Sequence, residues 1–231
     1  MKLVSFDVWN TLLNINQMLE ELTKALAELT NRTKEEVSEK VREAREEIKA
    51  IRKNKTGDPE RALEESQEIL AEKLGADTEI VKRAAAKTTL RVDEGFVIRG
   101  AIEGLKAAKG RDLIVVTLGN VMFWPSAYTR LILEKFGLAD FIDKQFYSDE
   151  LRAYKPMKEV FLGPLEHFGV EPSEALHIGD TYAEDFEGAL SAGLWAVWVN
   201  PDAEKVERIA DRGFVVRNAG ELGEVLESIG V

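Results

Sequence analysis

Residues 2–13 read KLVSFDVWNTLL, and this stretch decides the fold. Its first part, KLVSF, is a short apolar run rich in strand-forming residues that ends at Asp7. Similar runs recur farther along the chain as DLIVVT (112–117), ALHIGD (175–180) and AVWV (196–199). Helical patterns separate most of these runs. The alternation predicts an α/β fold in which helices cover both faces of a parallel sheet.

Composition excludes several classes of protein. The 231 residues are 45% hydrophobic, which is enough for a sizeable core. The formal charge of −11 argues against a nucleic-acid partner, because such binding relies on lysine and arginine neutralising phosphates. The chain has no cysteine and two histidines, which excludes disulfides and zinc–thiolate sites and nearly excludes a histidine metal cluster. No run approaches the about 20 apolar residues of a membrane span, so we expect a cytoplasmic protein without membrane contact.

Residues 15–94 form a long insertion between the first two predicted strands, and all of its signals are helical. We predict four helices there, near 17–30, after a capping box at 33–36, from Asp58 to Gly75 and near 78–89. This pattern predicts an α/β core domain of residues 1–14 and 95–231 and a small all-helical domain of residues 15–94 that hinges over it. The alternative is a helical subdomain packed rigidly on the sheet.

Polar residues stand where the predicted strands end. Asp7 ends the first strand, Thr117 ends the second, and Asp180 ends a later one, within GDTYAED (179–185). Lys155, in AYKP, lies between the second and that later strand in sequence. In an open parallel sheet, ligands bind beyond the carboxyl ends of the strands, so we expect these side chains to meet in one site.

This order of residues along the chain resembles the motifs of the haloacid dehalogenase (HAD) superfamily of hydrolases. The motifs are an acid, a hydroxyl, a lysine and a pair of acids. Residues 1–14 and 95–231 follow that pattern, and the helical insertion after the first motif resembles the superfamily's cap domain. The resemblance implies a Rossmann-like α/β core and hydrolysis of a small molecule, either a phosphate ester or a haloacid.

The resemblance also implies roles for the acids. Asp7 would be the nucleophile and form a covalent acyl intermediate that water later opens. Asp180 and Asp185 would hold Mg²⁺ together with Asp7 and the backbone carbonyl of Trp9, because magnesium prefers hard oxygen ligands. Thr11 would steady the loop after the nucleophile by hydrogen bonding.

The remaining motif residues are expected to bind the reacting anion. Thr117 would donate its hydroxyl to the anion, next to backbone amides of the following residues. Lys155 would balance the charge of Asp7 and the phosphate. Asn10 is expected to tolerate an unusual backbone conformation. The residues expected to contact the substrate are Trp9, Asn10, Leu118, Gly119 and Asn120.

Trp9 departs from the phosphatase pattern. In the superfamily's phosphatases this position is usually an aspartate that protonates the leaving alcohol and then activates water, and tryptophan does neither. Dehalogenases typically have tyrosine there, because halide leaves without a proton. They also usually lack the metal and the acid that corresponds to Asp180, whereas Asp180 and Asp185 are both present in this chain. An acid pair facing Asp7 would repel it unless a cation lay between them.

We therefore expect a magnesium-dependent phosphatase for a small phosphate monoester, with activity that is reduced or limited to certain substrates. Two alternatives stay open. One is a metal-independent 2-haloacid dehalogenase that forms an ester at Asp7. The other is a weakly active or non-catalytic protein that binds a phosphorylated ligand while Trp9 fills the site. The sequence sets neither the oligomeric state nor the physiological substrate.

Other prominent residues receive structural interpretations. His177 is expected to be buried and hydrogen-bonded rather than a base, and Pro164 to kink or break its helix. For Trp124, pocket lining and interior packing are equally favoured. The arginines expected on solvated helix faces, with none assigned as a halide ligand, are Arg32, Arg42, Arg45 and Arg52.

Overall fold

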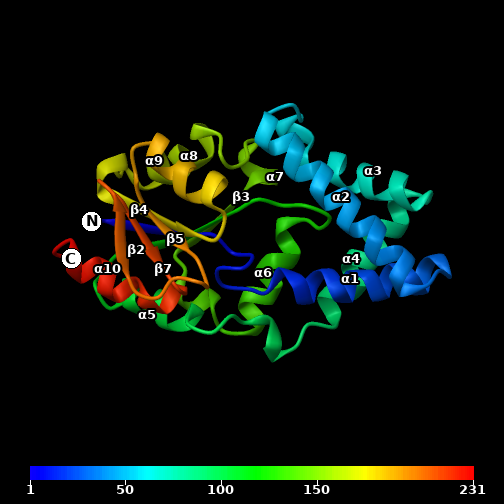
Figure 1. Ribbon diagram of the computed structural model, residues 1–231, viewed down its shortest axis with the longest axis horizontal. Coiled ribbons are helices and arrows are strands. Elements are labelled where there is room, and N and C mark those ends of the chain that lie inside the picture. Colours follow the sequence, from blue (N-terminus) through cyan, green and yellow to red (C-terminus); the bar gives the residue numbers. More distant parts are fainter.

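A seven-stranded sheet forms the centre of the protein in the computed structural model, which describes residues 1–231 (Figure 1). The strands are β1 (Leu3–Phe6), β2 (Ile114–Gly119), β3 (Lys144–Tyr147), β4 (Ala175–Gly179), β5 (Trp195–Val199), β6 (Glu207–Ala210) and β7 (Gly213–Val216). Their order across the sheet is β3-β2-β1-β4-β5-β7-β6, and only β6 runs antiparallel, beside β7. The predicted parallel α/β fold is confirmed.

The register of β1 aligns the motifs at one edge of the sheet. Phe6 lies opposite Thr117 of β2 on one side and Ile178 of β4 on the other. Asp7 and Asp180 therefore both leave the sheet at the carboxyl ends of neighbouring parallel strands. This is the edge at which open α/β sheets bind their ligands.

Helices cover both faces of the sheet. They are α5 (Ala101–Lys109), α6 (Ser126–Lys135), α7 (Ser148–Leu151), α8 (Lys158–Phe168), α9 (Glu187–Ser191) and α10 (Leu222–Ser228). Successive strand residues point to opposite faces, so Val4 of β1 packs in one apolar cluster with Leu105 of α5, whereas Leu3 packs in another with Phe161 of α8. No helix is both long enough and apolar enough to cross a membrane.

Four α-helices lie within residues 15–94, between β1 and α5, as predicted. They are α1 (Ile15–Thr30), α2 (Lys34–Asn54), α3 (Ala62–Leu74) and α4 (Thr78–Leu90), and Figure 1 shows them grouped beside the sheet. The capping box of Thr33 and Glu36 begins α2, and Gly75 ends α3 with a φ of 55°. One apolar cluster of 45 buried residues runs from Val4 of β1 to Met18 of α1 and Val41 of α2.

Some elements differ from the sequence-based prediction. The strands β3, β6 and β7 were not predicted, and the residues of β3 (KQFY) and β6 (ERIA) do not form an apolar run. Of the kink or break expected at Pro164, the break is wrong, since α8 runs through Pro164 without interruption. Pro164 is buried within α8 and has no N–H to donate to the preceding turn.

Candidate active site

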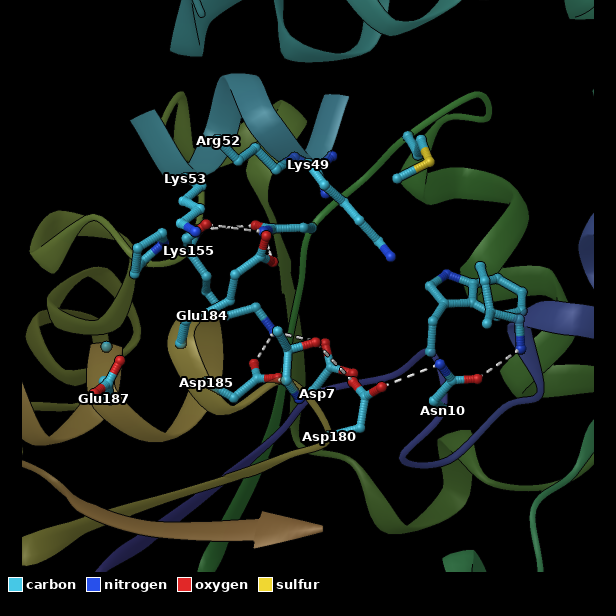
Figure 2. Close-up of a pocket in the computed structure, with 18 of the residues that line it drawn as sticks. Asp7, Asn10, Lys49, Arg52, Lys53, Lys155, Asp180, Glu184, Asp185 and Glu187 are labelled. Carbon is cyan, nitrogen blue, oxygen red and sulfur yellow. Dashed lines mark hydrogen bonds and ion pairs between the residues drawn. The ribbon is translucent and has the colours of Figure 1, made fainter. Parts of the chain in front are cut away.

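A cavity of about 750 Å³ opens at the carboxyl edge of β1, β2 and β4. Asp7 follows β1 and Asp180 follows β4, while Asp185 comes from the short π-helical turn Tyr182–Phe186. Lys155 reaches the same point from the loop before α8. Figure 2 shows these four side chains close together at the base of the cavity, with Asp7 between the lysine and Asp180.

Lys155 is the centre of a buried ionic cluster. Its Nζ lies 2.5 Å from Oδ1 of Asp7 and 2.6 Å from Oδ1 of Asp185, and its side chain is 2% exposed. The second oxygen of Asp7 accepts a hydrogen bond of 3.3 Å from the hydroxyl of Thr11. The second oxygen of Asp185 accepts one of 2.8 Å from the backbone N–H of Thr181. One lysine thus links acids that follow two different strands.

His177 supports Asp185 from the interior of the sheet. Its Nε2 lies 3.1 Å from Oδ1 of Asp185, and its Nδ1 lies 3.0 Å from the hydroxyl of Ser5. Burial lowers the pKa of His177, which keeps the ring neutral. A neutral ring has one N–H, so donation from Nε2 to Asp185 leaves Nδ1 to accept from Ser5. His177 is buried and hydrogen-bonded, as the sequence analysis expected.

The three acids compete for a single positive charge. Burial raises the pKa of Asp7 to about 8, and Asp185 and Asp180 add to this rise against the attraction of Lys155. Burial and Asp185 likewise raise the pKa of Asp180 to about 6. Burial also disfavours ionised Asp185, but Lys155 and the bond from His177 hold its pKa well below the usual range. Full ionisation of all three acids therefore requires more positive charge than Lys155 supplies.

A hard divalent cation fits this arrangement. One carboxylate oxygen from each of Asp7, Asp180 and Asp185 lies within 4.8 Å of the others. Carboxylate oxygens are the ligands that Mg²⁺ prefers, and two positive charges would relieve the repulsion among the three acids. The acidic cluster is therefore suited to hold a metal ion. Trp9, whose carbonyl was expected to be a further ligand, also lines the cavity.

The loop after β1 has a left-handed residue at Asn10, with a φ of 65°. This agrees with the expected unusual backbone, which asparagine tolerates better than most residues. The Asn10 side chain donates a hydrogen bond of 3.0 Å to Oδ2 of Asp180, and its Oδ1 accepts one of 3.4 Å from the N–H of Ile15. Asn10 thus connects the first motif to the fourth and to the start of α1.

The end of β2 contributes Asn120 to the cavity wall, whereas Thr117, Leu118 and Gly119 do not line it. The Thr117 hydroxyl is fully buried and has no hydrogen-bond partner, and Leu118 packs in the second apolar cluster. The amide of Asn120 accepts from the Lys155 N–H at 2.9 Å and donates to the Lys155 carbonyl at 3.1 Å. Asn120 therefore holds the backbone that carries the lysine.

Two tryptophans form an aromatic wall of the cavity. The rings of Trp9 and Trp124 meet edge to face, with centroids 5.2 Å apart and an interplanar angle of 74°. Trp124 lines the cavity and is also almost fully buried, so both interpretations of this residue hold. Trp9 presents an indole where an aspartate would serve as a proton donor.

The sequence analysis missed the contribution of α2. Arg52 was expected on a solvated face, but its side chain is buried, it lines the cavity, and it donates a hydrogen bond to the carbonyl of Val121. Arg45 also lines the cavity and is only partly exposed, whereas Arg32 and Arg42 are exposed as expected. The signal that could have found this face is the spacing of basic residues at 45, 49, 52 and 53.

Glu184 is a further cavity residue that was not predicted. Its Oε2 accepts a hydrogen bond of 2.9 Å from the side-chain amide of Asn120. Burial raises the pKa of Glu184, and the opposing attraction comes mainly from Arg52. Glu184 thus faces α2 across the cavity, next to the acidic cluster.

Comparison with known proteins identifies the class to which this fold and site belong. The haloacid dehalogenase-like hydrolase family matches residues 1–193, so the chain belongs to this family of hydrolases. It is 35% identical over 130 residues to the pyrimidine 5'-nucleotidase YjjG of Escherichia coli, and the match covers 55% of each chain. The chain thus matches about half the length of that relative.

Solved structures share the fold over nearly the whole chain. The HAD phosphatase of Thermococcus onnurineus has a TM-score of 0.69 at 25% identity, covering 98% of both chains. A 2-haloacid dehalogenase from Pseudomonas syringae pv. Tomato DC3000 has a TM-score of 0.70 at 21% identity, covering 100% of both chains, and this likeness shows the fold alone. The predicted superfamily and hydrolase class are confirmed.

Proposed function

We propose that this hydrolase is a magnesium-dependent phosphatase that cleaves a small phosphate monoester through an aspartyl-phosphate at Asp7. The observation that carries the proposal is the acidic cluster, in which Asp180 and Asp185 have oxygens within 4.8 Å of one of Asp7. Hydrolysis of a haloacid through an ester needs no metal, and two extra acids would then only repel the nucleophile. A cation bound between the three acids would remove this repulsion and leave Asp7 free to act as a nucleophile.

Each residue of the cluster has its own role in the proposed reaction. Mg²⁺ held by Asp7, Asp180, Asp185 and the carbonyl of Trp9 would polarise the phosphoryl oxygens and reduce repulsion between two anions. Lys155 supplies the fixed positive charge beside Asp7, and Thr11 orients the second Asp7 oxygen. These contacts hold the carboxylate in place before the substrate arrives.

The chemical steps follow from these positions. The carboxylate of Asp7 attacks phosphorus, and the bond from phosphorus to the alcohol oxygen breaks as the new bond forms. The alkoxide takes its proton from solvent, because Trp9 carries no acidic group. Water then attacks phosphorus, the bond from phosphorus to the Asp7 oxygen breaks, and the proton of the water passes to solvent. Inorganic phosphate leaves, and the Asp7 carboxylate is free again. Substrates with good leaving groups are expected to react fastest.

The helical insertion has a place in the same proposal. We assign residues 15–94 to a cap domain and residues 1–14 and 95–231 to the core that carries the acids. Support comes from the cavity, whose lining combines Asp7 and Asp180 with Arg45 and Lys53 of α2. A cap in this position would exclude water from the reacting phosphoryl group when substrate binds.

One assay tests the proposal against its alternatives. Hydrolysis of p-nitrophenyl phosphate and of 2-chloropropionate is measured with Mg²⁺ and with chelator, on the wild type, Asp7→Asn and the matched surface variant Asp202→Asn. We expect phosphate release that requires Mg²⁺, is lost in Asp7→Asn and is kept in Asp202→Asn. Phosphate release that ignores chelator or survives Asp7→Asn would overturn the proposal.

Trp9 is the observation that favours a second candidate, the metal-independent dehalogenase, because halide leaves without a proton. Chloride release from 2-chloropropionate that persists in chelator and requires Asp7 would establish that candidate. Turnover of neither substrate would favour a protein that binds a phosphorylated ligand without hydrolysing it.

A further inference from the structure

The last turns of α2 place a row of basic residues on the cavity. Arg45, Lys49 and Lys53 follow one another at intervals of four residues and therefore share one face of the helix, and all three line the cavity. Figure 2 shows Lys49 and Lys53 on α2, facing the cavity from the side opposite Asp7 and Asp180. We call Arg45, Lys49 and Lys53 the α2 basic row.

The cavity is polarised between its two walls. The acids that line it are Asp7, Asp180, Glu184, Asp185 and Glu187, and all of them belong to the sheet edge and the segment after β4. Five of its six cations, Arg45, Lys49, Arg52, Lys53 and Lys55, lie within residues 45–55, and the sixth is Lys155. This concentration of positive charge is local, because the whole chain has a net charge of −11.

The α2 basic row is not used by the protein's own acids. Arg45 and Lys53 form no ion pair, and Nε of Arg45 is buried without a hydrogen-bond partner. Lys49 contacts only Glu46 of its own helix, at 3.2 Å, in an exposed pair that contributes little. In contrast, Lys24 and Lys73 of the same helical insertion are paired with glutamates. The row is therefore available to a ligand.

The row is also separate from the groups that would bind the reacting phosphoryl group. Lys155 and the acidic cluster lie together at the opposite wall. Arg52 does not belong to the available set, because it is bonded to the carbonyl of Val121 and faces Glu184. The rings of Trp9 and Trp124 also line the cavity and offer an apolar surface to a carbon skeleton.

We propose that the α2 basic row binds a second phosphate of the substrate, so that the preferred substrate is a small organic bisphosphate. The proposal rests on the proposed function for the place of the first phosphate. An arginine and two lysines supply enough positive charge to bind a phosphate dianion, and the cavity of about 750 Å³ falls in the size range of small-molecule sites. One phosphate would meet Asp7 while the other pairs with α2.

Binding to a non-turnover protein tests this inference directly. In the Asp7→Asn background with Mg²⁺, calorimetry compares the affinity for fructose 1,6-bisphosphate with that for fructose 6-phosphate. A second comparison, of 3-phosphoglycerate with glycerol 3-phosphate, asks whether the row binds a carboxylate instead of a phosphate. The double variant Arg45→Gln/Lys53→Gln removes charge from the row. The matched control Arg42→Gln/Lys40→Gln removes the same charges from α2 outside the cavity.

We expect the unaltered row to bind the bisphosphate at least about tenfold more tightly than the monophosphate, and the double variant to lose about tenfold for the bisphosphate only. The control variant should keep the preference, and equal melting temperatures verify its fold. Equal losses for both ligands, or no preference before mutation, overturn the inference. A preference for 3-phosphoglycerate without one for the bisphosphate also overturns it, and assigns a carboxylate to the row.

The second-phosphate site and the proposed phosphatase activity can fail independently of each other. If p-nitrophenyl phosphate is not hydrolysed but bisphosphate binding still depends on the row, the anion site stands and the phosphatase proposal fails. If p-nitrophenyl phosphate is hydrolysed with Mg²⁺ but the row variants bind both ligands as before, the phosphatase proposal stands and the second-phosphate site is wrong.

Discussion

The ammonium of Lys155 lies 2.5 Å from a carboxylate oxygen of Asp7, a residue 148 positions earlier in the chain. Both side chains are almost fully buried, and the same ammonium lies 2.6 Å from Asp185. Removing one member of a buried charge cluster is costly, because the remaining charges lose their compensation. The contact therefore links the stability of the core to the proposed chemistry.

Lys155→Met tests that link. We expect a loss of about 3–5 kcal/mol in the free energy of unfolding, and phosphatase activity lower by about 100-fold or more. Mg²⁺ should restore part of the stability, because it binds among the same acids. Chemical denaturation with and without Mg²⁺ measures this, with the exposed Lys158→Met as control. Unchanged stability in Lys155→Met would contradict the role of this cluster.

Trp9→Asp places a proton donor where Trp9 now meets Trp124. We expect activity to rise by about 10- to 100-fold on an alkyl phosphate such as glycerol 3-phosphate, and by less on p-nitrophenyl phosphate, whose leaving group needs no proton. Trp9→Asn is the matched control, since asparagine has nearly the size of aspartate but cannot transfer a proton. Equal or lower activity in Trp9→Asp would mean that the indole has a role of its own in the pocket.

Gln67 joins α3 to the segment after β2. Its Nε2 donates a hydrogen bond of 3.1 Å to the carbonyl of Phe123, while Arg52 and Ser66 bond to the carbonyls of Val121 and Met122. Gln67→Met should destabilise the protein by about 1–3 kcal/mol, because a buried carbonyl loses its donor. Urea denaturation of Gln67→Met measures this, and a free energy of unfolding equal to that of the wild type would rule out the bond as a tie between helices and core.

The ionisation of Asp143 makes the free energy of unfolding depend on pH in the acid range. Its carboxylate accepts bonds from Lys109 at 2.7 Å and from the Val115 N–H at 2.8 Å. Burial disfavours its ionised form, but these bonds outweigh burial and hold its pKa below the usual 3.8. A lowered pKa contributes stability above 3.8 that is lost as the pH falls through the value in the folded state.

Asp143→Asn should therefore lower the melting temperature at pH 7, by an amount that corresponds to about 1 kcal/mol for a partly exposed pair. The difference from the wild type should shrink as the pH falls below 3.8 and the wild-type carboxylate takes up its proton. Thermal denaturation across this range measures the effect. A difference that stays constant with pH would contradict the assigned charge.

Two of the predicted site residues have positions that follow from the sheet itself. Asp7 and Asp180 end neighbouring parallel strands, so the topology alone brings them to one edge. Asn10 could be predicted from local backbone preference, because few other residues tolerate its φ of 65°. Local geometry and strand order were enough for these three.

The α2 side of the cavity could not be predicted in the same way. The burial of Arg52 depends on how α2 packs against the carbonyl of Val121, 69 positions later, and helix periodicity does not reveal that contact. Thr117 is the converse case, because its place in β2 was predicted but its hydroxyl is buried without a hydrogen-bond partner and the residue does not line the cavity. Packing between distant segments decides both cases.

The most direct test of the central claim is the detection of phosphorylated Asp7. The enzyme is mixed with p-nitrophenyl phosphate and Mg²⁺, quenched in acid within milliseconds, and its peptides are analysed by mass spectrometry. We predict that the peptide containing Asp7 gains the mass of one phosphoryl group, and that this gain is absent in chelator and in Asp7→Asn. Substrate turnover without a phosphoryl group on Asp7, or with one on another residue, would contradict the account.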